Sequence, residues 1–188
     1  MKKIILFLLI ACMGITGCQS AKRTTNISSN VKGLIYNSVS SSYLPRLTTV
    51  SLSEFADGSE FLTYKTETYE SLYGVPQFIV FSIPINNIDD HRVLLEKFLE
   101  WDKKALSRGD MFTKELGRAK AYNGYSNYTF HSGNKSNNYL DICFSMVDSS
   151  GCSVESVAFD TENVKNILND IDRIKSGKIK HLDDSVYK

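Results

Sequence analysis

The stretch QFIVFSIPINNIDDHRVLLEKFLEWDKKALSRG, from Gln77 to Gly109, contains a change of hydrophobic period that decides the fold class. Its first part, Gln77–Ile83, is almost entirely apolar, which is typical of a central strand buried on both faces. Its second part, Asn87–Gly109, repeats apolar residues at helical spacing, with two acids in the first turn and a glycine at the end. The apolar stripe that we expect in the core consists of Leu94, Leu95, Phe98, Leu99, Trp101 and Ala105.

Two further strands are predicted before this stretch. Leu47–Leu52 is rich in β-branched residues, and Phe61–Tyr69 alternates in the manner of a half-buried strand. The turn residues Tyr73–Pro76 separate Phe61–Tyr69 from the apolar strand that follows. We therefore expect these two strands to form a hairpin.

An antiparallel meander and a second helix are predicted after the first helix. Asn123-Gly124, which lies between two tyrosines, predicts a two-residue hairpin turn, and Asp148–Gly151 predicts another turn. The remaining expected elements are the strands Tyr125–Phe130, Tyr139–Val147 and Cys152–Phe159, the polar loop Ser132–Asn138, and a helix over Glu162–Ser176 that Asp160 or Thr161 caps.

This order of elements predicts an α+β fold. We expect one antiparallel sheet of about six to seven strands, including the C-terminal meander, with two helices packed on one face. A chain of 188 residues favours one domain, which we place at residues 31–178, followed by a loose polar tail at residues 179–188.

The N-terminus has the features of an export signal. Lys2 and Lys3 precede an apolar run that starts at Ile4 and closes with the tetrad Ile15-Thr16-Gly17-Cys18. As a helix, the 14 residues from Ile4 to Gly17 would span about 21 Å, which is less than the ~30 Å hydrocarbon core of a bilayer. The length therefore favours a cleaved signal peptide over a membrane-spanning anchor.

The closing tetrad resembles the lipobox of bacterial lipoproteins, and this resemblance covers residues 1–20 only. It implies that residues 1–17 are removed between Gly17 and Cys18, that Cys18 receives a diacylglyceryl thioether, and that its new amino group is acylated, for example with palmitate. Gln19 stands where an aspartate would retain such a protein on the inner membrane. The resemblance thus implies anchoring to the outer membrane, facing the periplasm. We interpret the polar residues that follow Cys18, up to residue 30, as a flexible tether with a reach of roughly 20 Å.

The charge of the chain excludes some partners. The formal net charge is +1, and removal of residues 1–17, which hold two lysines and no acid, makes it −1. A near-neutral domain lacks the basic stripe that binds nucleic acid and the polybasic surface that binds anionic lipids. We therefore expect no nucleic-acid partner and assign the membrane contact to the N-terminal lipid.

Cys143 and Cys152 stay in the mature chain, and two arrangements are open for them. A tight turn at Asp148–Gly151 would place Cys143 opposite Ser156, with the two sulfurs about 13 Å apart, which is too far for a disulfide. A wider loop or a bulge would bring the sulfurs together, and an oxidising periplasm favours their pairing. The alternative is two buried thiols that act as small hydrophobic side chains.

The chain contains none of the common catalytic or metal-binding motifs, so we expect no cofactor and no metal. His91 is expected among solvated residues of a first helical turn, and His181 in the loose tail. His131 ends a strand beside Ser132, but adjacent strand residues point to opposite faces, which argues against a catalytic pair. The candidate set for a periplasmic hydrolase is His131, Ser132, Asp141 and Glu115.

Tyrosine and asparagine gather in the meander, a composition that suits recognition of proteins and sugars. Tyrosines also pair well across antiparallel strands, which is the structural alternative. The candidate recognition surface consists of Tyr122, Tyr125, Tyr128, His131 and Asn134.

These features predict a membrane-tethered envelope lipoprotein that acts as a non-enzymatic binding module. A toxin-immunity protein and an accessory protein of a secretion or envelope machine are two forms of this hypothesis. The expected partner is an envelope or periplasmic protein, with a glycan as the alternative ligand. The competing hypotheses are a purely structural envelope lipoprotein and a periplasmic hydrolase.

Overall fold

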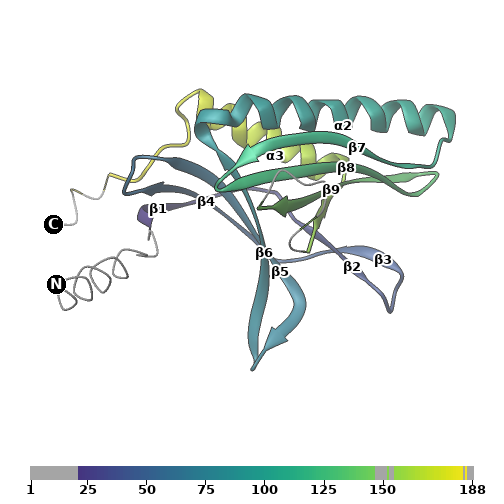
Figure 1. Ribbon diagram of the computed structural model, residues 1–188, viewed down its shortest axis with the longest axis horizontal. Helices are drawn as coiled ribbons and strands as arrows, with labels where there is room; N and C mark the ends of the chain where they lie inside the picture. Colours follow the sequence, from purple (N-terminus) through teal and green to yellow (C-terminus); the bar gives the residue numbers. More distant parts are fainter. Residues whose placement is uncertain (1–20, 147–151, 153–154, 184, 186–188) are drawn as a thin grey trace, which may run out of the picture.

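The structure, a computed structural model, describes residues 21–146, 152, 155–183 and 185 (Figure 1). The predicted signal peptide, its cleavage site at Gly17 and Cys18, and the predicted turn Asp148–Gly151 lie outside the described residues. The fold is α+β with antiparallel pairing, as predicted. The strands, however, form two sheets of four and six strands and not one sheet.

The four-stranded sheet has the order β1-β4-β5-β6, with strands β1 (Ala21–Ile27), β4 (Thr48–Phe55), β5 (Glu60–Leu72) and β6 (Val75–Pro84). The alternation predicted in β5 is confirmed, because Tyr64 and Thr66 are buried while Lys65 between them is exposed. The prediction that β6 is a central strand is wrong. β6 lies at the edge of its sheet, and Phe78 and Val80 are 39% and 52% exposed.

Residues 21–27 form a strand, so the prediction of a flexible tether through this segment is wrong. β1 pairs with β4 from Ala21 opposite Phe55 to Ile27 opposite Val50. An edge strand that is polar on both faces has no apolar alternation by which its sequence could be recognised. Backbone pairing holds it, together with the ion pairs of Lys22 and Arg23 with Glu54 on β4.

The predicted loose tail is packed against this sheet over its first residues. Ile179 is buried. The His181 ring lies with Nδ1 3.3 Å from the Thr25 hydroxyl oxygen and Nε2 3.1 Å from Glu60 Oε1. The ring therefore bridges β1 and β5, which no local sequence pattern indicates.

The six-stranded sheet has the order β3-β2-β10-β9-β8-β7. Its strands are β2 (Leu34–Asn37), β3 (Ser42–Pro45), β7 (Thr113–Ala121), β8 (Gly124–Asn134), β9 (Asn137–Ser145) and β10 (Val157–Phe159).

Two turns of this sheet differ from the prediction. The first hairpin is shifted by one residue, because Ala121 pairs with Gly124 and the turn is Tyr122-Asn123. Gly124 lies within β8, where a Cβ would come 2.2 Å from the Ser145 carbonyl oxygen. The segment predicted as a polar loop, Ser132–Asn138, belongs mostly to β8 and β9, since Asn134 already pairs with Asn137.

The α-helices of the described residues are α2 (Ile88–Arg108), which follows the short 3₁₀ turn η1 (Ile85–Asn87), and α3 (Thr161–Lys175). As predicted, both lie on one face of a sheet (Figure 1). The Asp160 side chain caps α3 by accepting a hydrogen bond from the Asn163 backbone N–H, and Gly109 ends α2 with a φ of 69°. Among the described residues, no helix combines the length and the apolar character that a membrane crossing requires.

Phe81 of β6 lies where both sheets and α2 meet. Its ring centroid is 6.1 Å from that of Tyr128 on β8, 6.0 Å from Phe159 on β10 and 6.3 Å from His91 on α2. Trp101, which we expected inside this core, is only half-buried and packs at its margin.

His91 is fully buried, so the prediction of a solvated first-turn residue is wrong. It lies one turn before Leu94 and Leu95, on the same face of α2. Its Nε2 donates to the Lys120 carbonyl oxygen at 2.9 Å, so its Nδ1 must accept from the Tyr128 hydroxyl at 2.5 Å. Burial lowers the pKa of His91, and the neutral ring is therefore the folded form.

We predict that stability depends on pH through this ring. The unfolded state binds a proton near pH 6.5, whereas the folded state resists protonation, so the free energy of unfolding falls as the pH drops below about 6.5. His91→Gln keeps a donor for the Lys120 carbonyl and removes the titration. Urea unfolding of both proteins between pH 7.5 and pH 5 measures the difference. A pH dependence equal in the two proteins would contradict this role of His91.

Candidate functional site

A two-stranded arm projects from the body of the protein. β4 begins at Thr48, opposite Thr66 of β5, and the Glu67 backbone N–H donates to the Leu47 carbonyl oxygen at 2.9 Å. Beyond Glu67, β5 pairs only with β6. We call Glu67–Phe78, which contains the hairpin turn, the arm. Figure 1 shows the arm leaving the molecule on the side away from α2 and α3.

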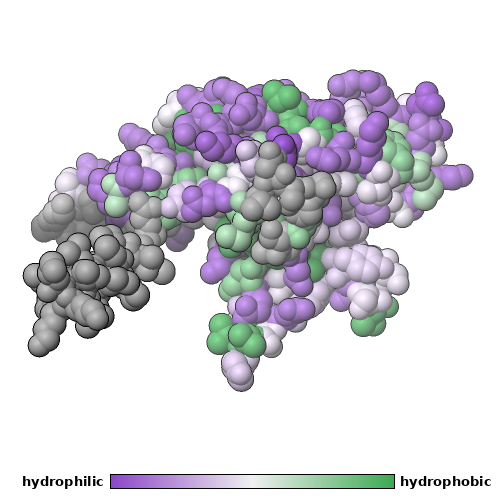
Figure 2. All heavy atoms as spheres, viewed as in Figure 1, coloured by the Kyte–Doolittle hydropathy of each residue, from purple (hydrophilic) through white to green (hydrophobic). Residues whose placement is uncertain are grey.

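The tip of the arm is apolar and exposed. Leu72, Tyr73 and Val75 are 59%, 96% and 60% exposed. Apolar colour accordingly marks the end of the arm in the space-filling view (Figure 2). Tyr73 and Gly74 have φ values of 50° and 79°, which is the backbone of a type I′ hairpin turn. A bulky residue such as tyrosine rarely adopts positive φ, and such backbone strain concentrates at functional sites.

The base of the arm is held by cations. The Arg46 guanidinium lies 4.4 Å from the centroid of the Tyr69 ring and donates to the Thr68 carbonyl oxygen at 2.9 Å. On the other strand, the Lys65 ammonium lies 4.0 Å from the centroid of the Phe78 ring. These contacts hold the base of the arm, and none of the described residues packs over its tip.

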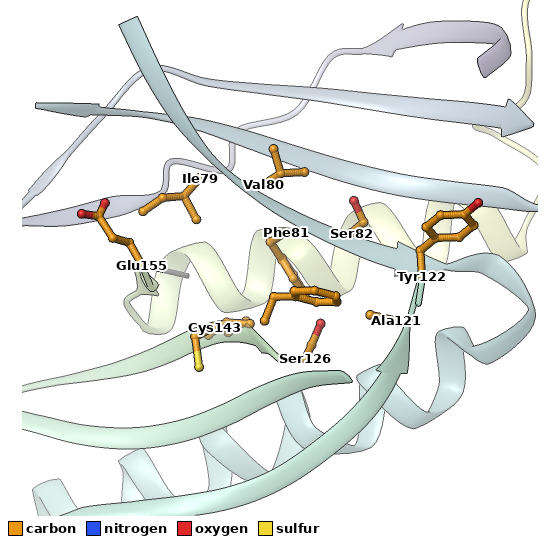
Figure 3. A pocket seen from close by; sticks show the side chains of 11 residues that line it. Ile79, Val80, Phe81, Ser82, Ala121, Tyr122, Ser126, Cys143 and Glu155 are labelled. Carbon is orange, nitrogen blue, oxygen red and sulfur yellow. The ribbon is translucent and has the colours of Figure 1, made fainter. Parts of the chain in front are cut away.

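A groove runs along β6 from the β7–β8 turn to the base of the arm, and Figure 3 shows its inner part. Its inner part, a hollow of about 180 Å³, lies between residues 79–82 of β6 and residues 142–144 of β9. Because successive strand residues point to opposite faces, a hollow that touches four in a row lies against the edge of the strand. A second hollow of about 490 Å³ shares Ile79, Val80, Phe144 and Glu155 with the first and extends it to Glu70 and Gln77.

The groove is apolar with an acidic margin. Phe81 and Ile142 line its floor, and the carboxylates of Glu70 and Glu155 stand at its outer part. Neither hollow has a lysine, arginine or histidine among the described residues that line it. An edge strand beside such a groove can bind an extended peptide by strand addition, and the charges favour a peptide with basic residues.

Cys143 lines the groove and forms a disulfide with Cys152, with a Cα–Cα distance of 5.6 Å. Val157 pairs with Ile142, a register that would place Cys143 opposite Ser156 if it continued. It does not continue, because β10 begins only at Val157. Cys152 therefore lies outside the ladder and reaches Cys143.

The predicted recognition residues do not form one surface. Tyr128 is fully buried and donates to His91. Tyr122 lies in the turn before the 11-residue strand β8 and Asn134 is the last residue of that strand, so the length of the strand, about 35 Å, separates them. Tyr125 packs under the Arg118 guanidinium, whose central carbon is 4.9 Å from its ring centroid. Of the five predicted residues, His131 included, only Tyr122 lines the groove.

The residues of the predicted hydrolase set have other partners. His131 Nδ1 lies 2.8 Å from the Thr113 hydroxyl, and the Ser132 hydroxyl donates to Asn138 Oδ1 at 2.8 Å. The His131 ring also packs against Tyr43, with centroids 6.2 Å apart. Burial raises the pKa of Asp141. Glu115 pairs with Thr129 in the β7–β8 ladder. Ser132 is therefore not activated by His131.

One group of side chains has metal-ligand character. Ligand atoms of Glu54, Glu60 and His181 lie within 4.8 Å of one another. However, Lys22 donates to one carboxylate oxygen of Glu54 at 3.0 Å, and Arg23 donates to the other at 2.9 Å. These hydrogen bonds lower the pKa of Glu54. The ion pairs already satisfy this carboxylate, so we do not assign a metal here.

Comparison of the chain with protein-family models, with curated proteins and with solved structures finds no match.

We predict that the disulfide stabilises the groove. Removing a cross-link that closes a loop of this size costs about 2 to 3 kcal/mol of unfolding free energy. The variant Cys143→Ser, Cys152→Ser should show this loss in urea unfolding at pH 7.5. A wild-type protein treated with reductant serves as the matched control and should give the same value. Equal stability of oxidised protein and double variant would show that the cross-link does not hold this fold.

Proposed function

We propose that this protein is a lipid-anchored lipoprotein of the outer membrane that faces the periplasm and binds a protein partner without catalysis. The lipobox supports lipid anchoring, and Gln19 after Cys18 supports the outer membrane as the location. The exposed apolar tip of the arm is the observation that supports binding. No part of the chain that the structure describes covers Leu72, Tyr73 and Val75, and exposed apolar clusters in folded proteins are typical of interaction sites.

The proposed partner is an envelope or periplasmic protein, and it would make two kinds of contact with this chain. Its apolar pocket would receive the tip of the arm, where a rigid tyrosine is a suitable anchor. An extended basic segment of the same partner would lie along the edge of β6, between Glu70 and Glu155. Toxins that enter the periplasm and subunits of envelope machines are both partners of this chemical kind.

We predict that Cys18→Ala releases the protein from the membrane fraction. The described domain lacks a membrane-spanning helix, so the lipid is the proposed attachment. Fractionation of cells, followed by detection of the protein in pellet and supernatant, measures the effect. Wild-type protein should be in the pellet and should incorporate labelled palmitate. A Cys18→Ala protein that stays fully in the pellet would disprove lipid anchoring.

We predict that the arm carries partner binding. A photo-crosslinking amino acid in place of Tyr73, expressed at native level, should form an adduct of defined mass with an envelope or periplasmic protein. The double variant Leu72→Ser, Val75→Ser should lose this adduct, because it removes the apolar tip.

The matched control is Val93→Ser. Val93 lies on α2 and is 61% exposed, close to the 60% of Val75, so the control changes surface polarity equally but outside the arm. Val93→Ser should keep the adduct. Adducts with phospholipid alone, or an adduct that survives loss of the tip, would overturn the assignment of the arm to protein binding.

A further inference from the structure

The start of β1 determines which end of the domain lies next to the membrane. β1 begins at Ala21, three residues after Cys18, and is paired with β4 from that residue onward. Three residues span at most about 11 Å when fully extended. If Cys18 carries lipid, the domain therefore has no flexible tether of 20 Å, and the first residue of its sheet stays within about 11 Å of the anchored cysteine.

The surroundings of Ala21 form one compact end of the molecule. Ala21 is opposite Phe55, the last residue of β4, and the Phe55 ring is stacked on Tyr122 of the β7–β8 turn, with centroids 5.7 Å apart. The Phe61 ring packs against both, at 5.4 and 5.3 Å. We call Ala21, Phe55–Ser59 and Tyr122 the anchor end. The anchor end joins the β4–β5 turn of the four-stranded sheet to the β7–β8 turn of the six-stranded sheet.

The chemistry of the anchor end suits lipid headgroups. Tyr122 is 39% exposed, and tyrosine rings are enriched at the level of the headgroups in membrane proteins. The turn residues Ala56, Asp57 and Gly58 beside it are exposed and small or polar. Lys22 and Arg23 carry two positive charges, and Glu54, with which both pair, and Asp57 of the adjacent turn carry two negative charges, so this end has no excess of basic charge that would require anionic lipid.

The arm lies at the other end of the same strand. β5 leaves the anchor end at Glu60 and reaches the tip of the arm at Leu72, and its 13 residues, with a register shift between Glu67 and Ser71, span at most about 40 Å. Figure 1 shows the start of β1 and the tip of the arm at different extremes of the molecule.

We infer that the anchor end rests on the lipid headgroups of the membrane that holds Cys18, and that β5 holds the tip of the arm at a fixed height above that surface. This inference rests on the lipid anchor of the proposed function. It adds that orientation is set by the rigid β1–β4 pairing and not by a tether. The arm therefore binds its partner in the periplasm and not in the bilayer.

The test uses the lipidated full-length protein in phosphatidylcholine vesicles that contain a nitroxide-headgroup lipid. A thiol-reactive fluorophore is placed by Ala56→Cys at the anchor end or by Tyr73→Cys at the tip, with the native disulfide oxidised. The label at position 56 should be quenched several-fold more strongly than the label at position 73. Equal quenching, or stronger quenching at position 73, would overturn the orientation.

A linker variant provides the matched control. Insertion of 12 Gly and Ser residues between Ser20 and Ala21 adds a flexible reach of about 20 Å, so quenching at position 56 should fall while the protein still sediments with the vesicles. Unchanged quenching would mean that the short connection does not set the orientation. Sedimentation separates the two proposals: protein that sediments without position-dependent quenching refutes only the orientation, and protein that fails to sediment refutes the lipid anchor as well.

Discussion

The packing of Phe81 against Tyr128 holds the two sheets together, and the rest of the structure depends on this contact. Phe81 belongs to the four-stranded sheet, yet its ring lies 6.1 Å from Tyr128 in the six-stranded sheet. His91 fixes the Tyr128 hydroxyl from α2. Because β6 is tied to β8 and β9 at this place, its unpaired edge runs beside β9 and leaves the groove between them. Beyond the contact, β5 and β6 continue together as the arm.

The proposed site of membrane attachment and the proposed site of partner binding lie at opposite ends of one strand, β5. The anchor end contains Ala21, the first residue of β1, and the arm contains the apolar tip. β5 connects them: it pairs with β4 from Glu60 to Thr66, and with β6 from Phe61 to Glu67 and again at Ser71 and Leu72. The register shift between Glu67 and Ser71 is held by Arg46, which donates to the Thr68 carbonyl oxygen and lies over the Tyr69 ring. In the proposed function, a partner would therefore meet a tip of defined height and direction, at a low entropic cost of ordering it.

Much of the fold was predictable from local patterns. Both helices, the alternation of β5 and the meander follow from hydrophobic period and turn residues, and these depend on neighbouring positions. The predictions that were wrong concern features that depend on contacts between residues distant in the sequence. β1 has no apolar face, so only its pairing with β4 identifies it. Whether β6 is central or at an edge depends on the sheet order, which the apolar composition of Gln77–Ile83 cannot indicate. One local pattern indicates the arm: Leu72-Tyr73-Gly74-Val75 is an unusually apolar sequence for a turn.

The most direct measurement of the central claim is amide hydrogen exchange of the arm in two settings. In purified lipidated protein, the backbone amides of Glu67–Phe78 should exchange faster than those of α2, because both strands of the arm are open to solvent. In native envelope membranes, the same amides should become protected while those of α2 exchange as before. Equal exchange of the arm in both settings would contradict the claim that a partner covers it.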